Sequence, residues 1–457
     1  MQEIKCPNCG QVFKIDESNY DSIVRQIRNH EFDKEVKEKL DAAISLEKKD
    51  AELLLSDKMN EKDQIIASLK QEEVKGFYLN PLKQDVLKHL DANYIQKHPY
   101  IKDGYYFDYK NYPLGKSPYF MCGLYYIQEP SAMAVASCLD IQKDDYVLDM
   151  CAAPGGKTCY VASRLSNEGL MIANDISKLR ATILSSNIER FGLQNTIVTN
   201  VDPLKMKFKS FFDKIILDAP CSGEGMFRKD QEAINTWSMQ KINECAYIQR
   251  NLIDKAYQML KKDGILVYST CTYSLEENEK QVEYMINELG MKLIPIEKQE
   301  GMSDGFIEGT IRMYPFKNKG EGQFIALLQK TSETESSKEK ILKPNLNKEQ
   351  MMLVKKFYDE NLNIPVPLYL YQSNNHVYAI QNHFPDLSLK VLRNGLYLGE
   401  CKKGRFEPSL SLALTLSKED VKRSYDYSCD SQEIKDYLSG LTLKGEGKKG
   451  YGVIFVD

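Results

Sequence analysis

Residues 145–158 of this 457-residue chain read Asp145-Tyr146-Val147-Leu148-Asp149-Met150-Cys151-Ala152-Ala153-Pro154-Gly155-Gly156-Lys157-Thr158. The stretch predicts a strand, a tight glycine turn and the start of a helix. Because glycine has no Cβ, a cofactor can approach the backbone of such a turn closely. The stretch therefore favours a nucleotide-binding α/β unit.

Two familiar glycine-rich fingerprints do not match this turn. The dinucleotide fingerprint G-x-G-x-x-G needs a glycine spacing that residues 153–157 do not supply. The phosphate-binding P-loop needs a glycine at position 151, where Cys151 stands. The stretch therefore favours neither a nicotinamide-dependent dehydrogenase nor a P-loop nucleotidase.

Two carboxylates follow the next apolar runs of the chain. Asp175 ends the run of residues 169–174 and lies twenty positions after Gly155. A nucleotide-binding α/β unit keeps the carboxylate that binds the ribose hydroxyls at about this spacing. Asp202 follows residues 196–201 and is expected to end the third strand, near the adenine. Both are candidate cofactor ligands.

Two cysteines follow two further apolar runs. Cys221 comes after residues 211–218, within Asp218-Ala219-Pro220-Cys221-Ser222, and Cys271 comes after residues 264–269. Helical spacing over residues 238–262 makes the alternation βαβ, so both thiols are expected at the carboxyl edge of one parallel sheet. A thiol in a cleft is nucleophilic enough to attack an electron-poor ring carbon. The pair therefore suggests covalent chemistry.

Several segments together resemble one known family. They are, in the family's order, residues 123–133, 151–157, 218–229, 269–279, 312–315 and 320–324. The stretch from about 76 to 330 resembles the catalytic domain of the Sun-type RNA cytosine-5 methyltransferases, and specifically their bacterial RsmF-like branch. Phe316 departs from the pattern, since many relatives have histidine there. The resemblance implies an α/β fold: a Rossmann-like S-adenosylmethionine methyltransferase sheet with helices on both faces, a helical amino-terminal extension and a PUA-like α+β carboxy-terminal domain.

The resemblance also implies a role for each candidate residue. It places S-adenosylmethionine on Cys151, Ala152, Ala153, Pro154, Gly155, Gly156, Lys157, Asp175, Asp202 and Asp218. Cys271 is implied as the nucleophile and Cys221 as the thiol that assists product release, with Asp218 against the ring edge. The chemistry agrees, because carbon-5 of cytosine is a poor nucleophile until a thiolate adds to carbon-6 and produces an enamine.

The thiolate cannot come from a cysteine–histidine pair within this domain. No histidine occurs between His98 and His376, so Lys157, Arg228 or the substrate is expected to favour the charged sulfur. A stacked base is out of reach, and the substrate should therefore be locally open RNA, with 16S ribosomal RNA or the 30S particle implied by the family branch.

Four alternatives concern the nucleophile, the methylated atom, the RNA substrate and the class of protein. Cys221 could be the nucleophile, as a cysteine after proline is in DNA cytosine methyltransferases, but Cys271 would then be redundant. Amino-group methyltransferases are disfavoured, because nitrogen attack needs no thiol. Transfer RNA is the nearest alternative substrate. A non-catalytic RNA-binding scaffold would leave both cysteines without a purpose.

The charge of the chain is unevenly divided. The net charge is −4, but residues 1–74 carry 12 Lys and Arg against 17 Asp and Glu, a net −5, which leaves +1 for the remainder. RNA contact is therefore expected at local patches such as residues 402–405 and 444–449. Eleven cysteines without a secretory leader or membrane span predict a reducing cytoplasm.

Composition divides the chain into five parts. Residues 1–75 hold Cys6-Pro7-Asn8-Cys9 and a charged helical stretch over 19–73, and resemble an uncharacterised bacterial zinc-ribbon-like and coiled-coil head whose partner is unknown. One such pair supplies two of the four ligands that zinc prefers, so no metal site is assigned. The methyltransferase domain (76–330), a polar linker (331–345), a first small carboxy-terminal domain (346–390) and a truncated PUA-like RNA-binding domain (391–457) are expected to follow.

Overall fold

The computed structural model describes residues 2–5, 9–15, 60, 63–166, 168–445 and 449–457, which fall into two units, Met1–Ser68 and Leu69–Asp457. In the first unit, β1 (Gln2–Lys5) pairs in antiparallel with β2 (Val12–Ile15). Cys6 and most of the expected charged helix lie outside the described residues, and Cys9 is exposed. Within the described part of the chain, no group of three or more His, Cys, Asp or Glu side chains is placed to hold a metal ion.

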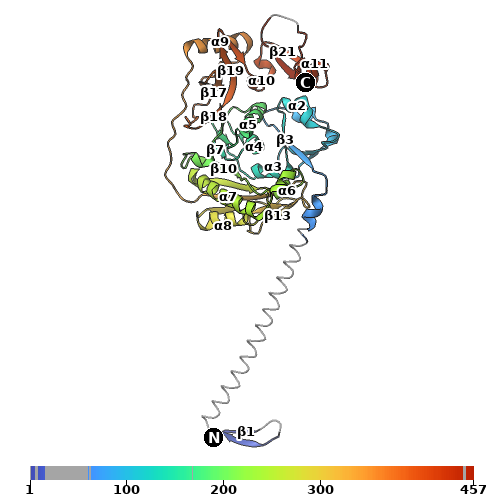
Figure 1. The fold of residues 1–457 in the computed structure, drawn as a ribbon, viewed down its shortest axis with the longest axis vertical. Coiled ribbons are helices and arrows are strands. Elements are labelled where there is room, and N and C mark those ends of the chain that lie inside the picture. Colours follow the sequence, from blue (N-terminus) through green and yellow to red (C-terminus); the bar gives the residue numbers. More distant parts are fainter. Residues whose placement is uncertain (1, 6–8, 16–59, 61–62, 167, 446–448) are drawn as a thin grey trace. The chain divides into compact units, whose positions relative to one another are not determined.

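A ten-stranded mixed sheet forms the centre of the second unit (Figure 1). Its parallel strands are β7 (Tyr146–Asp149), β8 (Leu170–Asn174), β9 (Thr196–Thr199), β10 (Phe212–Asp218) and β11 (Leu260–Thr270). Their spatial order is β11-β10-β7-β8-β9, so the strand order reverses between β7 and β10. Open α/β sheets bind their ligands at such a switch point, beyond the carboxyl ends of the strands.

Antiparallel strands extend the sheet at both edges. They are β12 (Lys292–Ile294), β13 (Met302–Asp304), β14 (Ile311–Met313) and β15 (Gln323–Gln329) beyond β11, and β18 (Val391–Asn394) beyond β9. β15 pairs with β11 along its length, which places Phe324 opposite Thr270. The segment of residues 320–324, which carries part of the family resemblance, therefore lies at the carboxyl end of β11.

Helices cover both faces of the sheet, because successive side chains of a strand point in opposite directions. Val147 packs with α3 (Pro130–Ser137), α4 (Gly156–Ala162) and α5 (Lys178–Phe191). Leu148 packs on the other side, with α7 (Met239–Met259) and α8 (Glu279–Asn287). The expected α/β class with a Rossmann-like sheet is confirmed.

The first part of the methyltransferase domain, before the central sheet, forms a small sheet of its own. Its strands are β3 (Lys75–Leu79), β4 (Ile95–Lys97), β5 (Gly104–Phe107) and β6 (Tyr125–Gln128), and they pair in antiparallel in the order β4-β5-β3-β6. Four short helices lie in the connections: η1 (Val86–His89), η2 (Ala92–Tyr94), η3 (Leu114–Lys116) and α2 (Pro118–Met121). Buried Phe77 packs edge-on against Tyr125, with ring centroids 5.4 Å apart. Aromatic residues favour strands, and here they also supply the core of the small sheet.

The carboxy-terminal region contributes a second four-stranded sheet. Its elements are α9 (Lys348–Asn361), β16 (Leu370–Ser373), β17 (His376–Ala379), β19 (Leu396–Lys402), β20 (Arg405–Pro408) and α10 (Leu410–Ala413). β17 pairs with β19, so this sheet runs across residue 390, where the sequence analysis separates two domains. β18, which precedes β19, joins the central sheet through β9 and thereby anchors the region to the methyltransferase fold.

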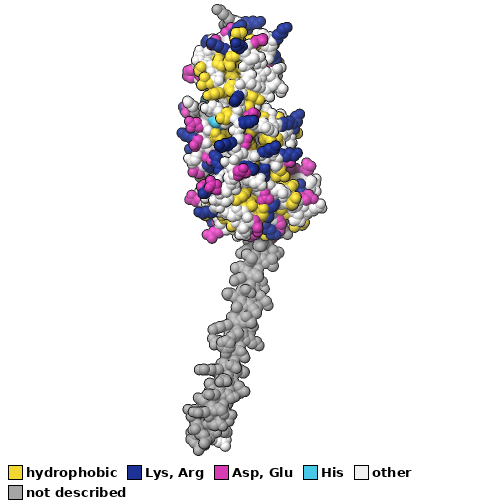
Figure 2. Space-filling view, turned by 90° about the vertical axis from the view of Figure 1, so that its left-hand side faces the viewer, with side chains coloured by type: hydrophobic (Ala, Val, Ile, Leu, Met, Phe, Trp, Pro, Cys, Tyr) yellow, Lys and Arg dark blue, Asp and Glu magenta, His cyan; other side chains and the backbone are white. Residues whose placement is uncertain are grey.

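The last strands and the short helices complete the second unit. They are β21 (Ser424–Tyr427), α11 (Gln432–Leu438), β22 (Val453–Val456), α6 (Gln231–Thr236), η4 (Pro203–Lys205), η5 (Glu224–Met226) and η6 (Lys418–Asp420). None of the helices in the described ranges is both long and apolar enough to cross a bilayer. On the face shown in Figure 2, Lys and Arg are interspersed with Asp and Glu, so this face does not present a field of one sign to a polyanion.

Candidate functional site

The glycine turn after β7 has the backbone that the sequence predicts. Gly155 has a φ of 116°, in the left-handed region that favours glycine, and it caps α4, which begins at Gly156. A Cβ on Gly156 would lie 2.7 Å from the side chain of Gln128. The turn therefore needs both glycines, one for its conformation and one for its close packing.

Two neighbouring cavities open around this turn. The larger, of about 800 Å³, is lined by Cys151, Ala153, Asp175, Asp202, Asp218, Cys221 and Cys271. The smaller, of about 330 Å³, is lined by Cys151, Ala152, Ala153, Pro154, Gly156, Lys157, Asp218 and Cys271. Every candidate residue except Gly155 lines at least one cavity, and Asp218 and Cys271 line both. The structure thus brings the predicted cofactor residues and the predicted nucleophile together.

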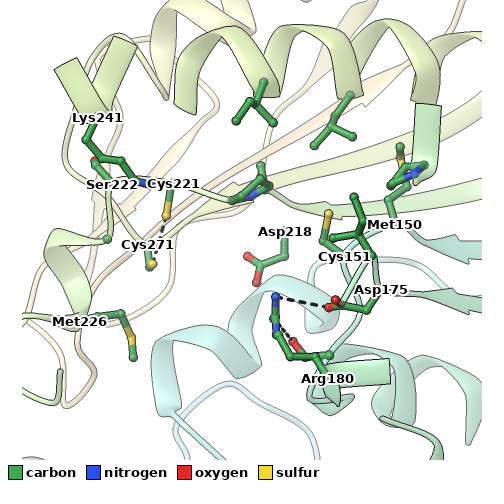
Figure 3. Close-up of a pocket in the computed structure, with 18 of the residues that line it drawn as sticks. Met150, Cys151, Asp175, Arg180, Asp218, Cys221, Ser222, Met226, Lys241 and Cys271 are labelled. Carbon is green, nitrogen blue, oxygen red and sulfur yellow. Dashed lines mark hydrogen bonds and ion pairs between the residues drawn. The ribbon is translucent and has the colours of Figure 1, made fainter. Parts of the chain in front are cut away.

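Asp175 presents a carboxylate at the end of β8. Its Oδ1 accepts a hydrogen bond from the Ser177 backbone N–H at 2.9 Å, and its Oδ2 lies 3.4 Å from an Arg180 nitrogen. Arg180 also donates to the carbonyl of Ala153 at 2.7 Å, and thus ties the glycine turn to α5 (Figure 3). Buried Oδ2 accepts no hydrogen bond among the described residues, and the ion pair with Arg180 at 3.4 Å is its charged contact.

Asp202, like Asp175, lines the larger cavity. Its Oδ1 accepts a hydrogen bond from the Leu204 backbone N–H at 3.0 Å and caps η4. The neighbouring Ile176 and Leu204 side chains are exposed at the cavity wall. This end of the cavity therefore combines carboxylates with apolar surface, as a nucleoside needs.

The two thiols lie side by side beyond β10 and β11. The sulfur of Cys221 is 3.2 Å from the sulfur of Cys271, and both cysteines are free (Figure 3). Hydrogen bonding to Cys271, together with burial, raises the pKa of Cys221 well above its usual range. Either sulfur can donate in this contact, so a proton on one thiol can be shared with the other. The sequence prediction that both thiols lie at one sheet edge agrees with this geometry.

Asp218, at the end of β10, is held by three donors. Lys157 Nζ donates to Oδ2 at 2.8 Å, while Ser269 Oγ and Gln323 Nε2 donate to Oδ1 at 2.6 and 3.1 Å. Burial lowers the pKa of Lys157, but the carboxylates of Asp218 and Asp149 outweigh burial and raise it. The site therefore keeps an ion pair whose carboxylate has a fixed orientation.

Asp149 is the other carboxylate near Lys157. It accepts a hydrogen bond from Thr158 Oγ1 at 2.7 Å on Oδ2, and buried Oδ1 has no hydrogen-bond partner among the described residues. Burial raises the pKa of Asp149 to about 7. Its charged form is thus costly within the fold, although Lys157 lies nearby.

Buried hydrogen bonds position the loops that carry the cysteines. Glu277 Oε2 accepts from the Ser222 backbone N–H at 3.0 Å and from Gln249 Nε2 at 2.8 Å, and the same Gln249 nitrogen donates to the carbonyl of Pro220 at 2.9 Å. These contacts fix the loop on both sides of Cys221. The Gly225 N–H donates to the carbonyl of Cys271 at 2.7 Å and links the two cysteine loops directly.

Several residues contact the site although the sequence does not predict a role for them. Ser269, Glu277 and Gln323 lie within segments that carry the family resemblance. The sequence pointed to these segments but not to the contacts of Ser269 and Gln323 with Asp218 or of Glu277 with Ser222, the residue after Cys221. Arg180 has no local sequence signal. Arg228, expected to favour the thiolate, instead pairs with Glu321 at 2.7 Å.

Three profiles of related protein families match parts of this chain. The profile of the family described as "16S rRNA methyltransferase RsmB/F" matches residues 136–329. The profile of the "N-terminal domain of 16S rRNA methyltransferase RsmF" matches residues 48–130, and that of the "RsmF rRNA methyltransferase first C-terminal domain" matches residues 356–416. The likeness therefore begins at residue 48, inside the segment 1–75 that the sequence analysis assigned to a separate head.

Relatives match over most of their length. The chain is 32% identical to "Ribosomal RNA small subunit methyltransferase F" of Vibrio vulnificus, over 78% of this chain and 79% of the relative. It is 32% identical to the protein of the same name from Photobacterium profundum, over 86% of this chain and 88% of the relative.

Two crystal structures from Pyrococcus horikoshii resemble the methyltransferase region. A methyltransferase homolog protein is 32% identical, with a TM-score of 0.52, over 58% of this chain and 90% of that protein. NSun6 with SFG is 27% identical, with a TM-score of 0.52, over 60% of this chain and 95% of that protein.

Proposed function

We propose that this chain, which belongs to the RsmF family of 16S ribosomal RNA methyltransferases, transfers a methyl group from S-adenosylmethionine to carbon-5 of a cytosine in 16S ribosomal RNA. The observation that carries the proposal is the 3.2 Å contact between the Cys221 and Cys271 sulfurs at the junction of two cavities. Methyl transfer to nitrogen or oxygen would need neither thiol.

The larger cavity fits S-adenosylmethionine. Its volume of about 800 Å³ lies within the range of ligand pockets, and Asp175 offers a buried carboxylate oxygen without a hydrogen-bond partner in the described chain. Asp175 would hold the ribose hydroxyls, and Asp202 would lie near the adenine. The turn of residues 151–157, of which Cys151 and Ala153 line this cavity, would contact the remainder. The related NSun6 structure was solved with SFG, an analogue of this cofactor. When bound, the cofactor supplies an electrophilic methyl group.

Cys271 would activate the base. Its thiolate adds to carbon-6 of the cytosine, and the electron pair of the C5–C6 bond makes carbon-5 nucleophilic. N3 gains a proton in this step, which balances the proton that the Cys271 thiol loses. Asp218 would contact the ring edge and stabilise the protonated N3, since Lys157, Ser269 and Gln323 hold its carboxylate in place. Once carbon-5 carries the methyl group, it must lose its proton and the carbon–sulfur bond must break.

Cys221 would assist this release. It lies within reach of the Cys271 sulfur. Once it has given up its own proton, Cys221 would take the proton from carbon-5, and the electron pair left behind would re-form the C5–C6 double bond and expel the Cys271 thiolate. Cys271 lines both cavities whereas Cys221 lines the larger of the two, and this supports Cys271 as the attacking sulfur.

The two basic patches expected to contact RNA are residues 402–405 and 444–449. Lys402 and Arg405, in one of the two basic patches expected from the sequence, both pair with Glu407. Their contribution to a polyanion contact is therefore reduced. Lys444 and Lys449 flank residues outside the described ranges, so the second patch remains a prediction.

Methylation assays separate the candidate substrates. Purified protein and radiolabelled S-adenosylmethionine would be offered 30S particles, naked 16S ribosomal RNA and transfer RNA. Labelling of ribosomal RNA is expected, and bisulfite sequencing of ribosomal RNA from a deletion strain should show the cytosine that loses its methyl group. Labelling confined to transfer RNA would overturn the substrate, and a protein that binds RNA without methyl transfer would be a scaffold.

A further inference from the structure

The contacts of Asp218 place three polar groups in a row on the wall of the smaller cavity. Lys157 binds one oxygen of the carboxylate, Oδ2, and Gln323 binds the other, Oδ1. All three residues line the cavity of about 330 Å³ that also contains Cys271. A base held over Cys271 would therefore meet the ammonium of Lys157, then the carboxylate of Asp218, then the amide of Gln323.

The amide of Gln323 has one permitted orientation. An ionised carboxylate accepts hydrogen bonds and cannot donate them, so the Gln323 nitrogen must face Asp218 Oδ1, 3.1 Å away. Ser269 and Lys157 also donate to Asp218, so both oxygens of this carboxylate act as acceptors. Rotating the amide would bring two acceptor oxygens together. Gln323 Oε1 is therefore held as an acceptor, and no donor among the described residues is bonded to it.

This row matches the edge of one pyrimidine. Lys157 offers a donor, the ammonium group. Asp218 offers an acceptor, the carboxylate, and Gln323 offers an acceptor, Oε1. A cytosine that has gained a proton on N3 during thiolate addition offers an acceptor at O2, a donor at N3 and a donor at N4. Uracil offers the same groups at O2 and N3 but an acceptor at O4. Of the three protein groups, Gln323 is the one that meets a different atom in the two bases.

We propose that Gln323 selects cytosine over uracil by accepting a hydrogen bond from the N4 amino group through Oε1, an inference that rests on the proposed methylation of cytosine. A uracil would place O4 against Oε1, and two facing acceptors in a desolvated pocket repel each other. Asp218 enforces the choice, because it prevents the amide from turning to offer its nitrogen instead.

Covalent trapping measures this selectivity directly. A 16S ribosomal RNA fragment that contains the methylated cytosine would carry 5-fluorocytidine or 5-fluorouridine at that position. Fluorine on carbon-5 leaves no proton to remove, so the sulfur–carbon bond persists and the adduct is visible on a denaturing gel. The unsubstituted protein should trap 5-fluorocytidine in strong preference to 5-fluorouridine. Gln323→Met should reduce this preference by about tenfold or more, because the acceptor is lost.

A matched control lies on the same strand. Gln329, at the other end of β15, donates to the carbonyl of Asp263 at 3.2 Å and lines neither cavity. Gln329→Met should leave the preference unchanged. If Gln323→Met traps both nucleotides with the preference of the unsubstituted protein, the inference is wrong. If the unsubstituted protein traps neither nucleotide, the proposed function fails and this inference fails with it.

A second arm leaves the protein unaltered, in case Gln323→Met does not fold. N4,N4-dimethylcytidine at the target position has no N–H at N4, so methyl transfer to it should be about tenfold slower than to cytidine, or slower still. Equal rates for the two nucleotides would overturn the role of Gln323.

Discussion

The sulfur of Cys221 lies 3.2 Å from the sulfur of Cys271, although fifty positions separate the two residues in the chain. The parallel pairing of β10 with β11 produces this contact, since Asp218 and Ser269 are opposite each other in the ladder, and Cys221 and Cys271 follow these two residues by three and two positions. One pyrimidine can therefore be reached by both thiols, and the two can act at different steps.

Removing each thiol should have opposite consequences for the covalent intermediate. Cys221→Ala should accumulate a protein–RNA adduct that survives denaturation, because Cys271 can still attack but release is impaired. Cys271→Ala should form no adduct and transfer no methyl group. Denaturing gels with labelled ribosomal RNA measure both outcomes. Cys401→Ala, in the carboxy-terminal sheet, serves as the control, and an adduct in Cys271→Ala would reverse the two roles.

Lys157 should matter for chemistry beyond its effect on stability. Lys157→Met leaves the carboxylate of Asp218, which is partly exposed, without its cation, and should cost about 2 kcal/mol in the free energy of unfolding. Methyl transfer should fall by about 100-fold or more, because Asp218 loses its orientation. Rates are best measured at a temperature where the variant remains folded.

Lys214 offers a matched comparison for Lys157. It is also buried and pairs with a buried aspartate, Asp145, at the opposite end of the sheet. Lys214→Met should lower stability by a similar amount while leaving the rate of methyl transfer of the folded protein nearly unchanged. Equal losses of rate in both variants would show that the effect of Lys157 is structural.

Gly225 should tolerate no side chain. A Cβ there would lie 2.8 Å from the carbonyl oxygen of Cys271 and 3.1 Å from that of Gly322, and backbone atoms cannot move aside cheaply. Gly225→Ala should therefore displace Cys271 and slow methyl transfer by about 100-fold, while S-adenosylmethionine still binds. Calorimetric titration and single-turnover rates separate the two effects. Gly115→Ala, whose Cβ would have no neighbour closer than 3.6 Å, should behave like the unsubstituted chain.

Asp149 should make stability depend on pH. Burial raises its pKa from an ordinary 3.8 to about 7, so between these values the folded chain holds a proton that the unfolded chain has lost. Stability from this group should thus fall as the pH rises from 3.8 to 7 and remain reduced above 7. Asp149→Asn removes the charge and should be more stable than the unsubstituted protein by about 2 kcal/mol at pH 8, with little difference near pH 4.

Urea unfolding at several pH values tests this expectation. The exposed neighbour Asp144 provides the control, since Asp144→Asn should not change the pH dependence. A difference between Asp149→Asn and the unsubstituted protein that is constant from pH 4 to pH 8 would contradict the prediction.

Local patterns were sufficient for the parallel strands and for the positions at their carboxyl ends. The runs before Asp175, Asp202, Asp218 and Cys271 are apolar and short, and each is followed by a side chain that lines a cavity. The amino-terminal sheet of β3 to β6 was not anticipated, because its strands pair with partners up to some fifty residues away and their aromatic residues pack in a core that no local pattern reveals.

The sequence alone determined which side chains could do chemistry here: a glycine turn, carboxylates after strands and two thiols after two strands. Tertiary structure decided how they act on one another. Gln323 comes to Asp218 from a strand more than a hundred residues later, and the sulfur of Cys221 contacts a sulfur from another loop. Hydrogen bonds depend on distance and direction between atoms, and for residues this far apart in the chain both are set by how the strands pair in the sheet.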